Sequence, residues 1–154
     1  MRLYFAGPLF SEAERAFNLS LTHKLEALGF TVFLPQRDGV ERDKPPYDTM
    51  PAEQRRQLLF ETDRDEVLKA DVFLYVLDGR VPDEGASVEL GIAYAHKHLT
   101  GARKVLVGLH TDVRASFLGA KLNPMLRVPL EHLVESEKDL IALLVDLFTS
   151  KGQR

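Results

Sequence analysis

The sequence predicts an α/β fold: a doubly wound (flavodoxin-like or Rossmann-like) sheet of five parallel strands with helices on both faces. Two observations carry this prediction. Five short β-like runs alternate with longer helical patterns, an order that implies right-handed crossovers between parallel strands. The run DVFLYVLD is the most continuous apolar one, as expected of a strand that is buried on both faces. The length of 154 residues suits one core, so residues 1–154 are expected to form a single domain.

The first half of the chain predicts two strands and two helices. RLYFAG (2–7) is the first expected strand, and a stripe of apolar residues predicts a helix over 12–29. FTVFLP (30–35) is the second expected strand, and a polar, proline-rich loop follows it over 36–51. The helical pattern then returns over 52–70.

The second half is expected to contain the other three strands, at residues 71–78, 103–110 and 130–134. A helix is expected over 84–99, and a loop with a short helix over 111–128. Ser136 is expected to cap the last helix, with Asp139 at the third helical position as in a capping box.

The fold class also predicts where a ligand binds. In open parallel sheets, ligands bind beyond the carboxyl ends of the strands, near the point where the strand order reverses. The loops expected to surround the site are therefore 6–11, 35–51, 78–85 and 110–124.

Composition excludes several classes of protein. The formal net charge is −3, from 20 basic and 23 acidic residues, and no Lys/Arg-rich run predicts a nucleic-acid surface. No apolar stretch approaches the roughly 20 residues that span a bilayer, so no membrane association is expected. The amino end lacks the features of a signal peptide, and the expected location is cytoplasmic. The absence of cysteine excludes disulfides, thiolate metal sites and a cysteine nucleophile.

Sequence motifs exclude further kinds of site. The loop after the first strand is not G-x-G-x-x-G, and no P-loop occurs, so a dinucleotide or triphosphate site is not expected. The five histidines show no metal-ligand spacing, and no serine lies in a G-x-S-x-G elbow. Neither a metal nor an organic cofactor is predicted.

Carboxylates are the remaining chemical groups in the loops of the expected site. These are Asp38, Asp43, Asp78 and Asp83. Glu89 lies early in the helix that follows, where the helix dipole favours its ionised form and partial burial opposes it. A carboxylate held anionic in a mostly dry pocket is a good nucleophile toward carbon, and Tyr4 on the first strand is placed to hydrogen-bond it. The plainer interpretations are a surface role for Glu89 and a helix cap for Asp83.

Four stretches, in this order, resemble the nucleoside 2-deoxyribosyltransferase family. They are YFAGPLF at the amino end, LPQRD after the second strand, ETDRDEVLKADVFLYVLDGRVPDEGASVELGIAYA in the middle and NPM near residue 124. The element D-x-G-x-x-x-E-x-G is the most specific of them. The resemblance covers most of the chain and implies an enzyme of nucleotide salvage that needs no cofactor.

The resemblance also implies a mechanism with three catalytic residues. Glu89 would attack C1′ of a 2′-deoxynucleoside, displace the base and form a covalent deoxyribosyl ester, which a second free nucleobase or water then resolves. Tyr4 would orient this nucleophile, and Asp63 would donate a proton to the departing base. Such a reaction passes through an oxocarbenium-like state that needs a carboxylate on one face and an acid at the leaving group.

The remaining residues implied by the resemblance bind the substrate. They are Asp83, Gly7, Gln36, Asp38, Gly85, Ser87, Asn123 and Met125. Asn123 and Met125 would come from a neighbouring subunit, which implies a homo-oligomer.

Two other functions stay open. One is an N-glycosidase that hydrolyses 2′-deoxynucleoside 5′-monophosphates, with Arg15 and Ser87 as phosphate contacts. The apolar first loop, GPLFSEAE, is a poor cradle for phosphate and favours nucleosides instead. The other is a non-catalytic nucleotide-binding module, because doubly wound sheets carry many functions.

Overall fold

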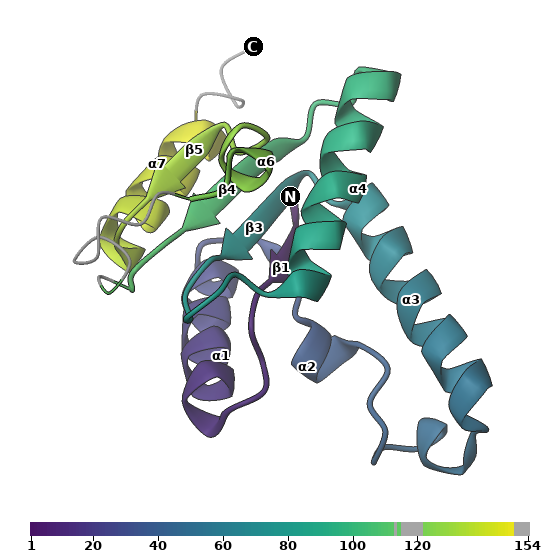
Figure 1. Cartoon of the computed structure of the whole chain (residues 1–154). Helices are drawn as coiled ribbons and strands as arrows, with labels where there is room; N and C mark the ends of the chain where they lie inside the picture. The colour runs from purple at the N-terminus through teal and green to yellow at the C-terminus, as the bar shows by residue number, and fades with distance from the viewer. Residues whose placement is uncertain (113, 115–121, 150–154) are drawn as a thin grey trace.

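The computed structural model describes residues 1–112, 114 and 122–149. Its five strands form one sheet in the order β2-β1-β3-β4-β5, and every neighbouring pair is parallel (Figure 1). The strands are β1 (Arg2–Ala6), β2 (Thr31–Phe33), β3 (Val72–Val76), β4 (Val105–Leu109) and β5 (His132–Val134). The predicted fold class is confirmed, because this is the doubly wound order in which the chain winds outward from β1 in both directions.

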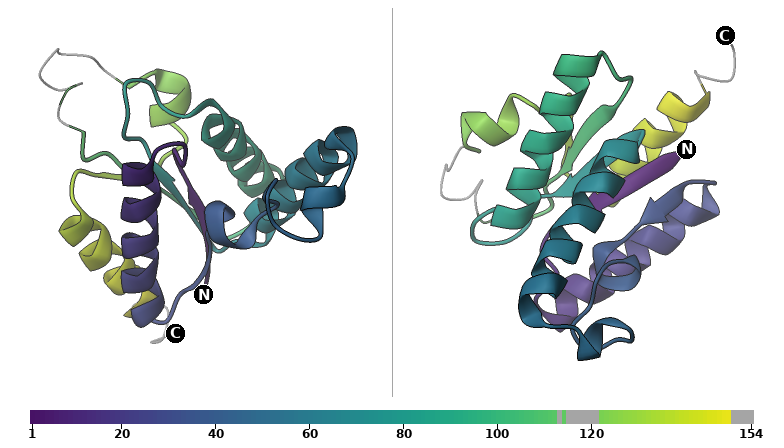
Figure 2. Two further views of the ribbon diagram at one scale, coloured as in Figure 1. Left: turned by 90° about the horizontal axis from the view of Figure 1, so that it is seen from below. Right: turned by 90° about the vertical axis from the view of Figure 1, so that its right-hand side faces the viewer.

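Helices cover both faces of the sheet (Figure 2). The longer ones are α1 (Glu12–Ala27), α3 (Ala52–Lys69), α4 (Glu84–Thr100) and α7 (Glu137–Thr149). One core cluster joins leucines of α1 and α7 to one face of the strands. The second cluster joins α3 and α4 to the other face, where Tyr4, Phe73 and Tyr75 are buried. Alternate residues of a strand face opposite sides, so the side chain of Tyr4 lies under α3 and α4.

A buried lysine holds the end of α3 against the sheet. Lys104 is only 2% exposed, and its ammonium donates to the carbonyl oxygens of Val67 (2.7 Å) and Ala70. These carbonyls lie at the C-terminal end of α3, where backbone acceptors have no partner within the helix. The contact fixes the helix that carries Asp63.

The segment expected to be an irregular loop contains two short helices. These are α2 (Pro35–Asp38) and the 3₁₀ helix η1 (Tyr47–Thr49). Pro35 is the first residue of α2, a position at which its missing N–H costs nothing and its fixed φ favours the helix. The carboxylate of Asp38 accepts a hydrogen bond from the backbone N–H of Leu34 (2.9 Å), which closes this turn.

The ends of the other elements agree with the sequence to within a few residues. Ser136 and Asp139 make the predicted contact at the start of α7, where the hydroxyl of Ser136 accepts from the Asp139 N–H (3.1 Å). The short helix expected over 111–128 is represented by α6 (Pro124–Arg127), and residues 113 and 115–121 of that stretch lie outside the described residues. Across the described ranges, no helix is both long and apolar enough to cross a membrane.

Candidate active site

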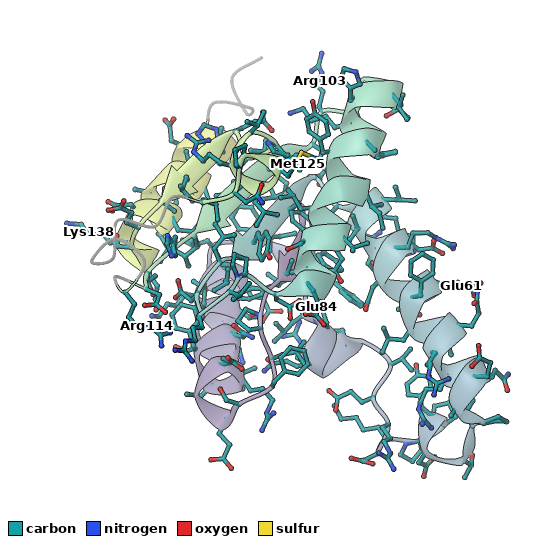
Figure 3. The ribbon with its side chains drawn as sticks, in the orientation of Figure 1. Glu61, Glu84, Arg103, Arg114, Met125 and Lys138 are labelled. Atoms are coloured by element: carbon teal, nitrogen blue, oxygen red, sulfur yellow. The ribbon has the colours of Figure 1, made fainter. Side chains whose placement is uncertain are left out.

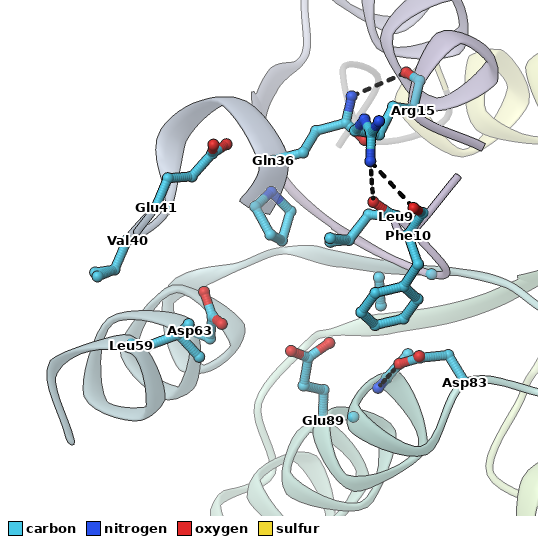
Figure 4. Close-up of a pocket in the computed structure, with 16 residues that line it drawn as sticks. Leu9, Phe10, Arg15, Gln36, Val40, Glu41, Leu59, Asp63, Asp83 and Glu89 are labelled. Carbon is cyan, nitrogen blue, oxygen red and sulfur yellow. Dashed lines mark hydrogen bonds between the residues drawn. The ribbon is translucent and has the colours of Figure 1, made fainter. Parts of the chain in front are cut away.

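A cavity of about 460 Å³ opens beyond the carboxyl ends of β1 and β2, between α3 and the start of α4 (Figure 4). Its walls come from the loop after β1, from α2 and the segment after it, and from α1, α3 and α4. The lining residues are Ala6, Gly7, Leu9, Phe10, Arg15, Pro35, Gln36, Gly39, Val40, Glu41, Leu59, Asp63, Asp83, Gly85, Ala86 and Glu89. Three of the four predicted loops therefore contribute to it. Thr111, Asp112 and Arg114 of the fourth loop lie instead at a separate hollow.

Glu89 lies in the cavity wall and is held from the sheet side by Tyr4. The tyrosine hydroxyl donates to Oε1 of Glu89 over 2.8 Å. Tyr4 is fully buried, and its ring stacks between Phe33 (centroids 5.6 Å apart) and Phe73 (5.8 Å). The small and apolar residues of α4 pack against the sheet, and this packing turns Glu89 toward the tyrosine. The carboxylate is thus fixed by a rigid aromatic stack rather than by a mobile side chain.

The pKa of Glu89 is raised from 4.5 to about 7. Burial is the largest cause, and the negative charges of Asp63 and Asp83 add to it, whereas the Tyr4 hydrogen bond acts in the opposite direction. The sequence-based expectation that the helix dipole keeps this group anionic is corrected here. Glu89 is the sixth residue of α4, and the dipole effect falls off within the first turn.

Asp63 faces the same cavity from α3 (Figure 4). Burial raises its pKa to about 6. Its Oδ1 is buried and has no hydrogen-bond partner within the part of the chain that the structure describes. An unpaired buried carboxyl oxygen is costly, and a ligand in the cavity would supply its partner. Burial and the charges of Glu89 and Asp63 raise the pKa of Tyr4 far above its usual range, so Tyr4 stays a donor.

Asp83 both caps α4 and lines the cavity. The sequence allowed either a helix cap or a substrate contact at this position, and the placement is compatible with both. Its Oδ1 accepts from the backbone N–H of Ala86 (2.8 Å). Its backbone carbonyl accepts from the hydroxyls of Tyr75 (2.7 Å) and Ser87 (2.6 Å). Ser87 is not among the lining residues, because its hydroxyl is engaged under the helix start with Asp83 and Tyr75. The prediction that Ser87 contacts substrate is not supported by this placement.

Gly7 and Gly85 line the cavity as predicted. A Cβ at position 7 would lie 2.9 Å from Cβ of Val76, so only glycine lets the chain leave β1 so close to β3. A Cβ at position 85 would lie 3.3 Å from Oδ1 of Asp83 and would crowd the cap.

Gln36 and Asp38 are both engaged by other groups of the protein. Gln36 lines the cavity, but its Nε2 donates to the Arg15 carbonyl (2.9 Å) and its Oε1 accepts from Asn18 (3.1 Å). Asp38 lies outside the cavity lining, paired with the guanidinium of Arg37 (2.8 Å). The structure thus places Asp38 in the closing of α2, and its role in base binding stays a prediction.

Two residues expected from a neighbouring subunit lie away from the cavity of their own chain. Asn123 caps α6 by accepting from the Met125 N–H (2.9 Å), and Met125 is 79% exposed (Figure 3). Of the other loop carboxylates, Asp43 is not among the lining residues, and Asp78 accepts from Thr111 and Asp112 across β3 and β4.

The sequence did not single out most of the apolar wall. Leu9, Phe10, Val40 and Leu59 form it, and Phe10 is 76% exposed beside the cavity. An exposed aromatic residue two positions after Gly7-Pro8, in a strand-end loop, was the available signal. Arg15 holds this loop in place, since its Nη1 donates to the carbonyls of Leu9 and Phe10 (3.2 Å each).

The cavity combines two carboxyl groups of raised pKa with apolar walls. Across the described residues, no group of three or more His, Cys, Asp or Glu side chains is placed to hold a metal ion. A carboxylate with an acid beside it can attack an electrophilic carbon and protonate its leaving group. Glycosidic bond cleavage is the reaction that requires this pairing.

Comparison with known proteins identifies relatives. A sequence model of the nucleoside 2-deoxyribosyltransferase family matches residues 3–144. Similar solved structures include a conserved protein from Enterococcus faecalis, which is 27% identical with a TM-score of 0.70 over 92% of this chain and 95% of that chain. No curated protein matches the sequence.

Two other solved structures are similar in fold. A 2-deoxyribosyltransferase from Bacillus psychrosaccharolyticus is 22% identical with a TM-score of 0.72, over 91% of this chain and 90% of that one. A CMP N-glycosidase from Clostridium botulinum is 21% identical with a TM-score of 0.54, over 96% of this chain and 99% of that one.

Proposed function

The chain belongs to the nucleoside 2-deoxyribosyltransferase family, and from that premise we propose that it transfers 2-deoxyribose between nucleobases through a covalent ester on Glu89. The single observation that carries the proposal is the buried Glu89 carboxylate, which accepts from Tyr4 (2.8 Å) and faces a cavity shared with Asp63. The substrates would be a 2′-deoxynucleoside and a free nucleobase, as in nucleotide salvage, and the location would be cytoplasmic.

Each residue has a role in a balanced exchange. The ionised oxygen of Glu89 forms a bond to C1′ while the bond from C1′ to the base nitrogen breaks, and Asp63 gives its proton to the departing base. The second base then attacks C1′, its ring proton passes to the Asp63 carboxylate, and the ester to Glu89 breaks. Tyr4 holds the attacking oxygen in place throughout, because its raised pKa keeps the hydroxyl protonated.

The charge of the cavity favours an uncharged sugar. Four lining residues are carboxylic acids (Glu41, Asp63, Asp83 and Glu89), and Arg15 is the one basic residue among the described lining residues. A 5′-phosphate would be repelled by this set of charges. Ser87, a phosphate contact in the competing hypothesis, is engaged with Tyr75 and Asp83 instead.

Hydrolysis of a nucleoside 5′-monophosphate is the second candidate, and Arg15 favours it. Arg15 lines the cavity, and only its Nη1 is used by the loop carbonyls of Leu9 and Phe10. A guanidinium with free N–H groups is a common phosphate ligand. Faster base release from a deoxynucleoside monophosphate than exchange on the nucleoside would favour this candidate.

The decisive experiment is base exchange with deoxyinosine and free adenine. The wild-type protein is expected to form deoxyadenosine, and trapping with donor alone is expected to add one deoxyribosyl group to Glu89, detected by peptide mass spectrometry. Glu89→Ala should abolish both signals. Glu84→Ala is the matched control, because Glu84 is an exposed acid in the first turn of the same helix (Figure 3). An exchange rate that survives Glu89→Ala would refute the mechanism, and binding without turnover would indicate a non-catalytic module.

We further propose that the active form is a homo-oligomer with Asn123 and Met125 completing a neighbour's cavity. Large apolar side chains are exposed on and beside α4 and α6. They are Val81 (76%), Val88 (60%), Met125 (79%) and Val128 (73%). Contact with a second copy would remove this surface from water.

A further inference from the structure

The part of the cavity beyond Asp63 carries hydrogen-bond acceptors. Glu41 follows α2 and lies at the same side of the cavity as Asp63, whereas Arg15 lies at the other side (Figure 4). The ion pair of Glu41 with Lys44 (3.1 Å) uses Oε1. Among the described residues, Oε2 of Glu41 therefore has its acceptor capacity left for a ligand.

Two side-chain donors of the described lining, Arg15 and Gln36, lie on the other side of the cavity from Asp63 (Figure 4). The amide of Gln36, to which the sequence pointed for base recognition, lies beside Arg15, where its Nε2 donates to the Arg15 carbonyl and its Oε1 accepts from Asn18 (Figure 4). The guanidinium of Arg15 also lies on that side, with its Nη1 bonded to carbonyls of the loop after β1. The edge of a base that extends past Asp63 toward Glu41 consequently meets the Glu41 carboxylate, away from the side-chain donors of Arg15 and Gln36.

We infer that Glu41 makes the site selective for bases with an exocyclic amino group next to the protonated ring nitrogen, and for 6-aminopurines over 6-oxopurines. The inference rests on the proposed function, in which Asp63 protonates the departing base. On a purine, the N7 acceptor lies beside the group at C6, which is the N6 amino donor in adenine and the O6 acceptor when that group is oxo. With Asp63 at N7, Glu41 accepts from the amino group of adenine and opposes the carbonyl oxygen of hypoxanthine.

The charge of Glu41 decides the sign of this selectivity. A hydrogen bond to a charged group is worth more than a neutral one, and two facing acceptors repel each other. We therefore expect adenine to be preferred over hypoxanthine by roughly tenfold or more. Glutamine at position 41 presents either its oxygen or its NH₂ group, so Glu41→Gln should bring the two bases to within about threefold of each other.

A competition between acceptors tests the inference. Equimolar adenine and hypoxanthine are supplied with each of four deoxynucleosides in turn, and the initial ratio of deoxyadenosine to deoxyinosine is measured. Both bases compete for the same glycosyl-enzyme, so the ratio does not depend on the donor. The wild type should give a high ratio of deoxyadenosine to deoxyinosine. The control Glu53→Gln, at an exposed position of α3, should give the same ratio, and Glu41→Gln should give a much lower one.

Two results would overturn the inference: a wild-type ratio within threefold of one, or a Glu41→Gln ratio equal to the wild type. Calorimetric binding of adenine and hypoxanthine to the same proteins makes the prediction independent of turnover. If no exchange occurs with any base, the proposed function fails, and tighter binding of adenine that Glu41→Gln removes would still support the selectivity. Equal binding of both bases would reject it.

Discussion

At the scale of single residues, Glu89 and Asp63 form a coupled pair of carboxyl groups. Burial is the leading cause of the raised pKa of each, about 7 for Glu89 and about 6 for Asp63. The proposed reaction needs Glu89 ionised and Asp63 protonated, so the pair must carry one proton. Because the pKa of Glu89 is the higher of the two, that proton lies mainly on Glu89, and the reactive arrangement is the minor one-proton form. Near pH 6 to 7 the pair holds about one proton in total, and below or above this range both groups are protonated or both are ionised.

The pair predicts a bell-shaped pH dependence of kcat/KM for exchange, with its maximum between about pH 6 and about pH 7. Tyr4→Phe removes the hydrogen bond that lowers the pKa of Glu89. The alkaline limb, which the group of higher pKa sets, should therefore move to higher pH. The same change should reduce kcat/KM by roughly 10- to 100-fold. Tyr94→Phe, at an exposed tyrosine of α4, is the control and should leave both limbs in place.

The raised pKa of Glu89 also makes stability depend on pH. The folded state binds this proton more tightly than the unfolded state, so its contribution is fully present below about pH 4.5 and is lost as pH rises through about 7. The rise from 4.5 to about 7 corresponds to about 3 kcal/mol. Glu89→Gln should therefore unfold at higher denaturant concentration than the wild type at pH 8, with the difference shrinking toward pH 5.

Denaturant titrations at several pH values measure this difference. Glu84→Gln should follow the wild type at every pH, because Glu84 is exposed. The raised pKa of Asp63 also makes the free energy of unfolding fall as pH rises, up to about pH 6. This dependence should remain in Glu89→Gln. A Glu89→Gln protein that is less stable than the wild type at pH 8 would contradict this prediction, because it would show that folding does not disfavour the ionised carboxylate.

At the scale of the element, the start of α4 is fixed from below by side chains of the sheet and of the helix itself. The hydroxyls of Tyr75 and Ser87 lie 2.8 Å apart and both reach the carbonyl of Asp83. This contact places the cap residue and the turn that precedes Glu89. Tyr75 is fully buried, and burial is the main cause that raises its pKa to about 12, so it stays a hydrogen-bond donor at neutral pH.

A double-mutant cycle measures this contact. Tyr75→Phe and Ser87→Ala should each lower the free energy of unfolding by about 1 kcal/mol. The two losses should not add, because both hydroxyls share one acceptor. Chemical denaturation gives the three values, with Ser20→Ala on exposed α1 surface as the control. Additive losses would show that the two hydroxyls act separately.

At the scale of the whole molecule, the proposed oligomer predicts complementation between two inactive variants. Glu89→Ala lacks the nucleophile, and Asn123→Ala lacks the residue proposed to serve the neighbouring cavity. In a mixed dimer, one site would combine Glu89 of one subunit with Asn123 of the other and regain full composition. Mixing equal amounts should restore about a quarter of the wild-type exchange rate, because half of the dimers are mixed and half of their sites are complete.

The mixing experiment has a physical control in the mass of the particle. Light scattering should show more than one copy for the wild type, and Met125→Glu should shift it toward the monomer by placing a charge on the exposed apolar surface. Complementation by variants that stay monomeric, or no activity in mixtures of confirmed oligomers, would contradict the shared site.

The order of the elements followed from the sequence because it depends on local patterns. The apolar run around residues 72–76 predicted a strand buried on both sides, and β3 is buried at every position. The rule for parallel sheets then predicted the end of the sheet at which the cavity lies. The segment after β2 was the least predictable, since a short helix begins at Pro35, the last residue of the expected strand, and runs into the expected polar loop.

The sequence by itself determined the sheet and the end of the sheet at which the cavity lies, because strand periodicity and chain order carry that information. It pointed to three of the cavity's four carboxyl groups, Asp63, Asp83 and Glu89, and missed Glu41. The tertiary structure alone decided what each polar group does. Tyr4 and Glu89 meet across 85 positions of sequence, and Gln36 and Asp38 are consumed by partners that only folding brings near. Burial depth and side-chain direction set the pKa of Glu89, and both arise from the packing of distant segments rather than from any local pattern.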